Sequence, residues 1–223
     1  MSTDRILVVS AHPDDEAIGC GGTLLKSAAN GAEIHWVVVT QAWAPKWTPA
    51  YQAKVREESD AVAALVAPGR LRRVGLPAAR LDDIPLTDLI DPIAAAIREI
   101  RPSTIYSVGP HDVNTDHLLV FRALEIALKP SYVGIDRWLT FELPGSTDWA
   151  VHPAAGPFVP NSFVDITAEI DRKVEVLGLY ATEMRTAPHP RSADGIRALA
   201  RVRGLSVGCG YAEAFELCRE LRR

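Results

Sequence analysis

The sequence predicts a single α/β domain in which helices cover both faces of a mostly parallel, Rossmann-like sheet. Apolar runs of strand length alternate with segments of helix length through the first half of the chain. The chain has 223 residues, of which 48% are hydrophobic, and this suits one globular core. Two strand-like runs end in histidine and carboxylate side chains, as expected where a parallel sheet binds ligands at its carboxyl edge.

The first predicted strand is the aliphatic run 6–9, which fits a central strand covered on both faces. Pro13 ends it, because proline offers no backbone N–H to a sheet. A helix is predicted over 17–30, where Asn30 and Gly31 form a typical left-handed stop. The β-branched run within 33–40 predicts the second strand.

The glycines within 19–22 have two interpretations. A glycine-rich loop can bind a dinucleotide, but here the glycines come well after the strand end and complete no glycine-spaced fingerprint. We therefore expect them to allow close packing of the first helix against the sheet or the metal-bearing loop.

The remaining elements continue the alternation and support right-handed crossovers. In the first half we predict a loop over 41–51, a helix over 52–65, a strand over 71–76, a helix over 86–99 with a break at Pro92, a strand over 103–108 and a helix over 117–128. In the second half we predict strands over 138–143 and 163–166, and helices over 170–180, 194–203 and 211–217.

The polar residues after the first strand suggest metal chemistry. His12, Asp14 and Asp15 offer one imidazole and two carboxylates within four residues, so a metal could take His12 and one carboxylate while the other stays free as a base. The alternative is that the carboxylates only cap the next helix. A second ligand-rich segment, 111–117, follows the strand 103–108 and is expected to converge on the first, which favours the metal interpretation.

Ala-His-Pro-Asp-Asp-Glu at 11–16, together with Asp116-His117, resembles the PIG-L/LmbE-like zinc N-deacetylases. The resemblance extends along most of the chain and includes the segments 56–58, 75–77, 80–82 and 117–120. It implies one LmbE-like deacetylase domain over 1–223 that binds Zn²⁺ and removes the N-acetyl group of an N-acetylglucosamine-type sugar or sugar conjugate. Carried over by position, it implies that His12, Asp15 and His117 bind zinc.

The same resemblance implies that Asp14 is the general base and that Arg56 contacts substrate. It also exposes one departure, because many relatives have a histidine where this chain has Asn114. Asparagine donates a neutral hydrogen bond but cannot deliver a proton, so Asp14 would also protonate the leaving amine. His189 or, less directly, His111 could replace the missing histidine.

Other candidates rest on weaker signals. Trp43 lies with Trp47 in a loop at the exit of the second strand, and an aromatic face there could stack on a sugar or pack on its own domain. Glu142 and Asp148 are candidate substrate contacts after the 138–143 strand, together with Ser146 and Trp149.

Charge and composition exclude several classes of function. The formal net charge is −4 and no basic run is present, so nucleic acid is not an expected partner. No apolar stretch approaches the roughly 20 residues that a bilayer requires, and we expect a cytoplasmic protein without a membrane span. Three cysteines without paired spacing argue against a disulfide framework. A homo-oligomer is left open.

Two alternative functions stay open beside the deacetylase. One is a zinc amidase that cleaves a larger acyl group from a sugar or thiol conjugate. The other is a non-catalytic, Rossmann-like nucleotide-binding protein, which would bind a cofactor without metal. A purely structural zinc module would need four protein ligands, whereas the motifs supply three and a free carboxylate.

Overall fold

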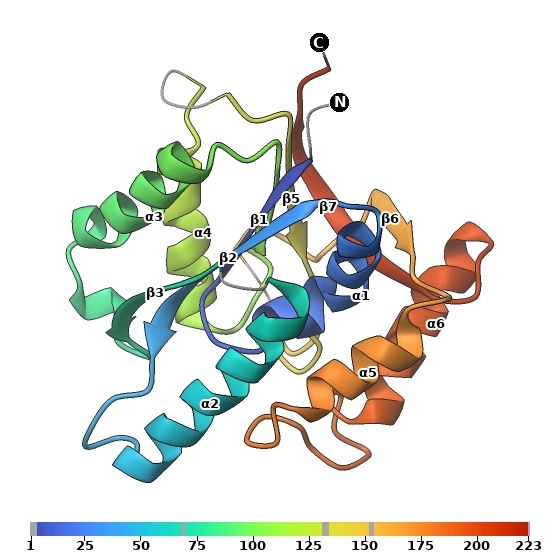
Figure 1. Cartoon of the computed structure of the whole chain (residues 1–223), viewed down its shortest axis with the longest axis horizontal. Coiled ribbons are helices and arrows are strands. Elements are labelled where there is room, and N and C mark those ends of the chain that lie inside the picture. Colours follow the sequence, from blue (N-terminus) through green and yellow to red (C-terminus); the bar gives the residue numbers. More distant parts are fainter. Residues whose placement is uncertain (1–3, 68–69, 131–133, 152–153, 223) are drawn as a thin grey trace.

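The computed structural model describes residues 4–67, 70–130, 134–151 and 154–222. One seven-stranded sheet runs through it, in the order β3-β2-β1-β4-β5-β7-β6 (Figure 1). The strands are β1 Arg5–Ser10, β2 Glu33–Gln41, β3 Leu71–Pro77, β4 Thr104–Val108, β5 Arg137–Phe141, β6 Ser162–Asp165 and β7 Ala212–Glu220. The first five strands are parallel, which confirms the predicted mostly parallel sheet.

The chain reverses its direction of travel across the sheet at β1. It passes from β1 to β2 and β3 on one side, and then returns to β4 on the other side of β1. β1 pairs with both β2 and β4 in parallel, so the carboxyl ends of β1 and β4 are neighbours. Such a switch point leaves a crevice above the strand ends, because the two flanking connections diverge.

Helices cover both faces of the sheet, as predicted. They are α1 Asp15–Ala29, α2 Pro49–Val66, α3 Leu86–Ile100, α4 Thr115–Ala127, α5 Ile170–Gly178 and α6 Ala193–Val207, with a short 3₁₀ helix at Leu81–Asp83. α3 packs against α4 on one face, while α1 packs against α5 and α2 on the other (Figure 1). The core strand residues Leu7, Val8 and Ile105 are completely buried between these layers.

The helix predicted over 211–217 is wrong. This segment is β7, which pairs antiparallel with β5 and with β6. Alanine and glutamate favour helices in isolation, but pairing with the open edge of β5 outweighs that preference. Four consecutive residues from Ala212 to Phe215 are buried, as in a strand covered on both faces.

Two proline positions also differ from the prediction. Pro92 was expected to mark either a break in the helix over 86–99 or the first turn of a new helix, yet α3 continues through it from Leu86 to Ile100. Because proline lies in the second turn of α3, only a hydrogen bond near the helix start is lost. Pro49 begins α2 within the segment predicted as a loop, and Thr48 Oγ1 accepts a hydrogen bond from Tyr51 N at the helix start.

The glycines of α1 permit close packing of this helix against the sheet, as expected from the sequence. A Cβ on Gly19 would overlap the ring of Phe141 in β5. α1 is also kinked at Cys20, whose φ of −142° is not helical.

Gly19→Ala is therefore expected to lower the free energy of unfolding by about 1–3 kcal/mol through overpacking. Chemical denaturation measures the change. Gly178→Ala in α5 is the matched control, because nothing lies within 4 Å of the added methyl group. That variant should be neutral or slightly more stable. Equal stabilities of the two variants would contradict the packing role.

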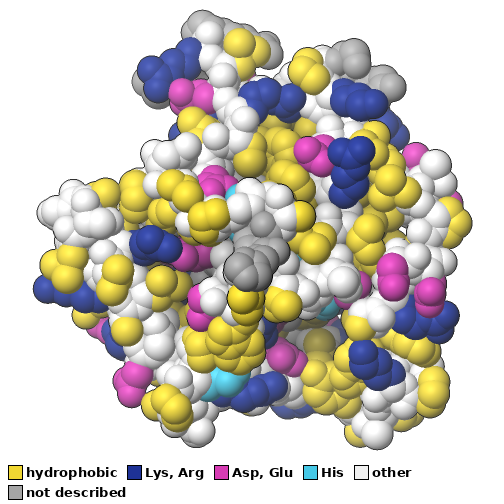
Figure 2. Space-filling model, turned by 180° about the vertical axis from the view of Figure 1, so that it is seen from behind, with side chains coloured by type: hydrophobic (Ala, Val, Ile, Leu, Met, Phe, Trp, Pro, Cys, Tyr) yellow, Lys and Arg dark blue, Asp and Glu magenta, His cyan; other side chains and the backbone are white. Residues whose placement is uncertain are grey.

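The surface carries mixed charge. Figure 2 shows basic and acidic side chains interspersed over the rear face of the molecule, with no continuous basic patch there. None of the helices in the described part of the chain has the length and apolar character needed to cross a bilayer.

Candidate functional site

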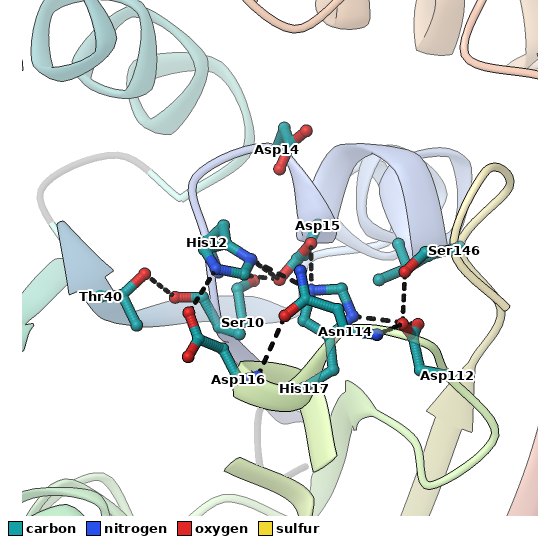
Figure 3. A network of polar contacts seen from close by, with 12 residues as sticks. Ser10, His12, Asp14, Asp15, Thr40, Asp112, Asn114, Asp116, His117 and Ser146 are labelled. Carbon is teal, nitrogen blue, oxygen red and sulfur yellow. Dashed lines mark hydrogen bonds and ion pairs between the residues drawn. The ribbon is translucent and has the colours of Figure 1, made fainter. Parts of the chain in front are cut away.

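Three side chains from two segments meet at the carboxyl ends of β1 and β4. His12 follows β1, Asp15 begins α1, and His117 lies in the first turn of α4. His12 Nδ1 is 3.0 Å from His117 Nε2, and the latter is 3.5 Å from Asp15 Oδ1. One donor atom of each residue lies within 4.8 Å of the others (Figure 3). The predicted ligand set is thus assembled in one place.

This donor set fits a divalent metal ion. Asp15 Oδ2 accepts a hydrogen bond from His12 N, but the buried Asp15 Oδ1 has no hydrogen-bond partner among the described residues. A buried carboxylate oxygen without a donor is unfavourable unless a cation neutralises it. Two imidazoles and one carboxylate are typical of a catalytic zinc site with an open position. The side chains of Asp15 and His117 are 1% exposed, and that of His12 is 22% exposed. Solvent therefore reaches the cluster on the side of His12.

Two further carboxylates hold the imidazoles in orientation. Asp116 Oδ2 lies 2.9 Å from His12 Nε2, and Asp112 Oδ2 lies 2.9 Å from His117 Nδ1. Each carboxylate favours a proton on the nitrogen that it faces, which leaves the lone pair of the other nitrogen directed into the cluster. Asp116 is itself fixed by the backbone N–H of Ala79 at 2.6 Å.

The electrostatics of the cluster favour a cation. Burial alone would lower the pKa of His117, but Asp15 and Asp112 outweigh it and raise this pKa to about 10. Burial acts to raise the pKa of Asp15, yet His117 and His12 hold it well below the usual range. The cluster therefore has a strongly negative potential that either protons or a metal ion can neutralise.

Asp112→Asn is expected to weaken metal binding about 10- to 100-fold, because an amide orients His117 less firmly than a carboxylate does. Metal retained after dialysis against graded chelator measures the effect. Asp148→Asn is the matched control, since the one hydrogen bond that Asp148 accepts from a described residue comes from Gly145 N in a turn. If both variants retained metal equally, Asp112 would not support the ligand.

Asp14 occupies an unusual position directly before α1. Its φ of 110° is rare for a residue with a side chain, and such strain is often found at functional sites. Asp14 N donates to Glu16 Oε2 at 3.2 Å, and Tyr180 Oη donates to Glu16 Oε1 at 2.7 Å, so buried groups hold this backbone. Asp14 Oδ2 forms an ion pair with Arg191 Nη1 at 3.0 Å.

Burial raises the pKa of the Asp14 carboxyl well above its usual range, although Arg191 opposes this shift. A raised pKa suits a general base that works near neutral pH. Burial likewise raises the pKa of Glu16 to about 8, against the opposing hydrogen bond from Tyr180.

A cavity of about 300 Å³ opens beside His12 and Asp14. Trp47 and Tyr51 are stacked, with ring centroids 6.4 Å apart, and both line it. The polar residues that line the rest of the cavity are Thr40, Asn114, Glu183 and Arg191. An aromatic wall opposite polar groups suits an amphipathic ring such as a sugar.

Residues 7–128, more than half of the chain, match the model of the PIG-L family, described as GlcNAc-PI de-N-acetylase. The chain belongs to the PIG-L family. A curated relative is the 1D-myo-inositol 2-acetamido-2-deoxy-alpha-D-glucopyranoside deacetylase of Rhodococcus erythropolis, which is 26% identical over 84% of this chain and 83% of that protein.

Solved structures share the architecture of this PIG-L protein. A conserved protein from Thermus thermophilus is 25% identical with a TM-score of 0.76, over 98% of this chain and 96% of that one. The 4-carboxy-2-hydroxymuconate hydratase of Pseudomonas putida is 23% identical with a TM-score of 0.74, over 99% of this chain and 98% of that one. The likeness to the hydratase concerns the fold alone.

Asn114 lies at the position described above as a departure from the family pattern. It caps α4, and its Oδ1 accepts a hydrogen bond from Asp116 N at 3.0 Å. With the oxygen engaged, the amide N–H₂ group is left to face the cavity that Asn114 lines.

Neither histidine considered as a replacement for the missing one lines this cavity. His189 Nδ1 accepts a hydrogen bond from Arg191 N at 3.0 Å, and its ring packs edge-on against Trp149. The ring nitrogens of His111 lie 2.7 Å from Gly156 O and 2.6 Å from Glu216 Oε2.

The other predicted substrate contacts also lie outside the lining of this cavity. Trp43 Nε1 donates to Ala78 O at 2.8 Å, and Arg80 lies over its ring. Both oxygens of Glu142 pair with Arg203, at 2.7 and 2.6 Å. Asp148 accepts from Gly145 N in a turn, while Ser146 Oγ donates to Asp112, behind the metal cluster.

Sequence reasoning missed several groups around the cavity. Arg191 lies two residues after His189, and it is Arg191 that reaches Asp14. Tyr51 Oη donates to Glu183 Oε1 at 2.7 Å across the cavity wall, and neither residue belongs to a recognisable motif. The orienting role of Asp112 and Asp116 could have been predicted, because carboxylates close to a ligand histidine commonly orient it.

Proposed function

We propose that this PIG-L protein is a zinc-dependent hydrolase that removes the N-acetyl group from an N-acetylglucosamine-type amino sugar or sugar conjugate. The observation that carries the proposal is that a three-residue cluster able to hold a metal and the buried carboxylate of Asp14, which is outside that cluster, lie beside one cavity. His12, Asp15 and His117 would hold the metal. The 26% identity to an inositol acetamidoglucopyranoside deacetylase supports this substrate class.

When bound, zinc supplies a Lewis acid for the amide carbonyl and lowers the pKa of a water molecule toward about 7. Asp14 accepts the proton of the attacking water and then donates it to the amide nitrogen as the C–N bond breaks, which yields acetate and an amine. Arg191, 3.0 Å from Asp14 Oδ2, holds the carboxylate in position. Asn114 donates a hydrogen bond to the carbonyl oxygen as negative charge develops there.

Asn114→Ala is expected to lower turnover roughly 10²-fold with metal content unchanged, because a single oxyanion donor is lost. Steady-state acetate release measures it, and zinc analysis accompanies each variant. His189→Ala is the comparison, since this ring packs against Trp149 outside the cavity lining and should have little effect. A large loss in His189→Ala with little loss in Asn114→Ala would reverse the assignment.

A substrate panel tests the proposal itself. N-acetylglucosamine, its inositol glycoside and diacetylchitobiose are incubated with the purified protein, and both acetate and free amine are measured. At least one of these should be hydrolysed, chelation should abolish the reaction, and stoichiometric zinc should restore it. Metal-independent hydrolysis, or no hydrolysis of any acetylated sugar, would refute the proposal.

Matched substrates separate the deacetylase from the amidase alternative. The same sugar carrying N-acetyl or N-butanoyl is compared by kcat/KM, and a preference for butanoyl would favour an amidase for larger acyl groups. A non-catalytic nucleotide-binding protein would instead bind a nucleotide without metal and hydrolyse neither substrate.

A further inference from the structure

A second cavity adjoins the one beside the metal cluster. It has a volume of about 180 Å³ and lies between the carboxyl end of β2 and helix α2. Pro13, Thr40, Ala42 and Val55 line both cavities. The two cavities are therefore neighbours that share this wall.

The two cavities differ in charge. Asp14 and Glu183 line the first, with Arg191 as its basic residue. Arg56 and Arg73 line the second, and no acidic side chain is among the described residues that surround it. The second cavity is thus basic although the chain has a formal net charge of −4. An anionic group is therefore favoured in the second cavity and disfavoured beside Asp14.

Arg73 is held in place with donors to spare. Its Nη2 donates to Ser59 Oγ at 2.6 Å and to Asp60 Oδ1 at 2.8 Å. No described residue engages its Nε or Nη1, and a guanidinium group has five N–H donors. The side chain is 23% exposed, so it is partly desolvated as well as fixed.

Arg56 has no such partner. Its backbone carbonyl accepts from Ser59 Oγ, but its guanidinium forms no hydrogen bond or ion pair with any described residue. It lies on the same cavity wall as Arg73. Two guanidinium groups, one fixed and one unpaired, suit the planar, bidentate recognition of phosphate or carboxylate.

We propose that this second cavity, lined by Arg56 and Arg73, binds an anionic group of the substrate while the N-acetyl sugar occupies the metal-side cavity. The inference rests on the proposed deacetylase function and narrows its substrate to an acetylated amino sugar that carries a phosphate or a carboxylate. The anion would also orient the sugar, because the two ends of the cleft differ in charge.

Binding to the zinc-loaded Asp14→Asn protein tests the proposal without turnover. Calorimetry compares N-acetylglucosamine with its 1-phosphate, its 6-phosphate and N-acetylmuramic acid, which carries a carboxylate. At least one anionic sugar should bind about tenfold more tightly than the neutral one. Arg73→Gln or Arg56→Gln, added to Asp14→Asn, should bring this ratio close to one.

Arg98→Gln is the matched control, since Arg98 is an exposed arginine in the last turn of α3 and should leave the ratio unchanged. The proposal is overturned if no anionic sugar binds more tightly than N-acetylglucosamine. It is also overturned if the ratio survives both Arg73→Gln and Arg56→Gln.

Inorganic phosphate separates this site from the deacetylase function. Phosphate binding is measured for the otherwise unaltered protein, for Arg73→Gln and for His117→Ala. If no sugar binds but phosphate binding is lost in Arg73→Gln, the deacetylase function fails and the anion site stands. If phosphate binding is lost only in His117→Ala, the ion binds at the metal cluster and the anion site is refuted.

Discussion

His117→Ala is expected to leave the protein without stoichiometric metal and without measurable deacetylation. His117 is one of the three proposed ligands, and its loss leaves the buried carboxylates Asp15 and Asp112 without the imidazole that lies between them. Two remaining ligands are too few to hold a catalytic zinc ion. Metal analysis after gel filtration and acetate release measure the two effects.

His35→Ala is the control for this experiment. His35 lies in β2 and is ion-paired with Glu33, remote from the cluster. It should retain metal and activity. Full metal content in His117→Ala would show that the ligands are a different set, and a matching loss in His35→Ala would indicate general unfolding instead.

Asp14→Asn is expected to retain zinc and lower kcat about 10²- to 10⁴-fold, because an amide cannot act as the general base. Asparagine has the same shape and tolerates positive φ better than most residues, so the backbone at 110° should survive the substitution. Single-turnover acetate release measures the chemical step directly.

One control variant supports the interpretation of Asp14→Asn. Asp148→Asn makes the same chemical change in a turn outside the cavity lining and should leave kcat within about twofold. Near-normal kcat in Asp14→Asn would assign the base to another group around the cavity, with Glu183 as the next candidate because it lines the same space.

The sequence determined the architecture of the parallel half and the location of the site. β1 and β4 are short, almost fully buried strands, and their local sequence patterns were enough to predict them. His12 follows β1 closely and His117 lies in the first turn of the helix after β4, so the parallel pairing of β1 with β4 helps to bring the two histidines together. Here the local sequence pattern and the sheet topology both place the two ligand-bearing segments side by side.

Predictions from the sequence were wrong where contacts with residues far away in the sequence determine the local structure. Residues 212–220 have helix-forming alanine and glutamate, and only the free edge of β5 makes them a strand. Packing against other elements also decided which loop tryptophan reaches the cavity. Trp43 was the predicted substrate contact, but it packs against Arg80, whereas Trp47 lines the cavity. The direction of a loop tryptophan is set by packing against other elements.

The sequence by itself therefore predicted the candidate ligand motif, the candidate base Asp14 and the strand ends that carry them. Only the tertiary structure brought Arg191 to Asp14 across 177 positions of sequence separation and turned His189 against Trp149. It alone also placed the cavity of Arg56 and Arg73 beside the metal-side cavity. Metal ligands are close in sequence to strand ends, whereas cavity walls depend on how separate helices and loops pack together.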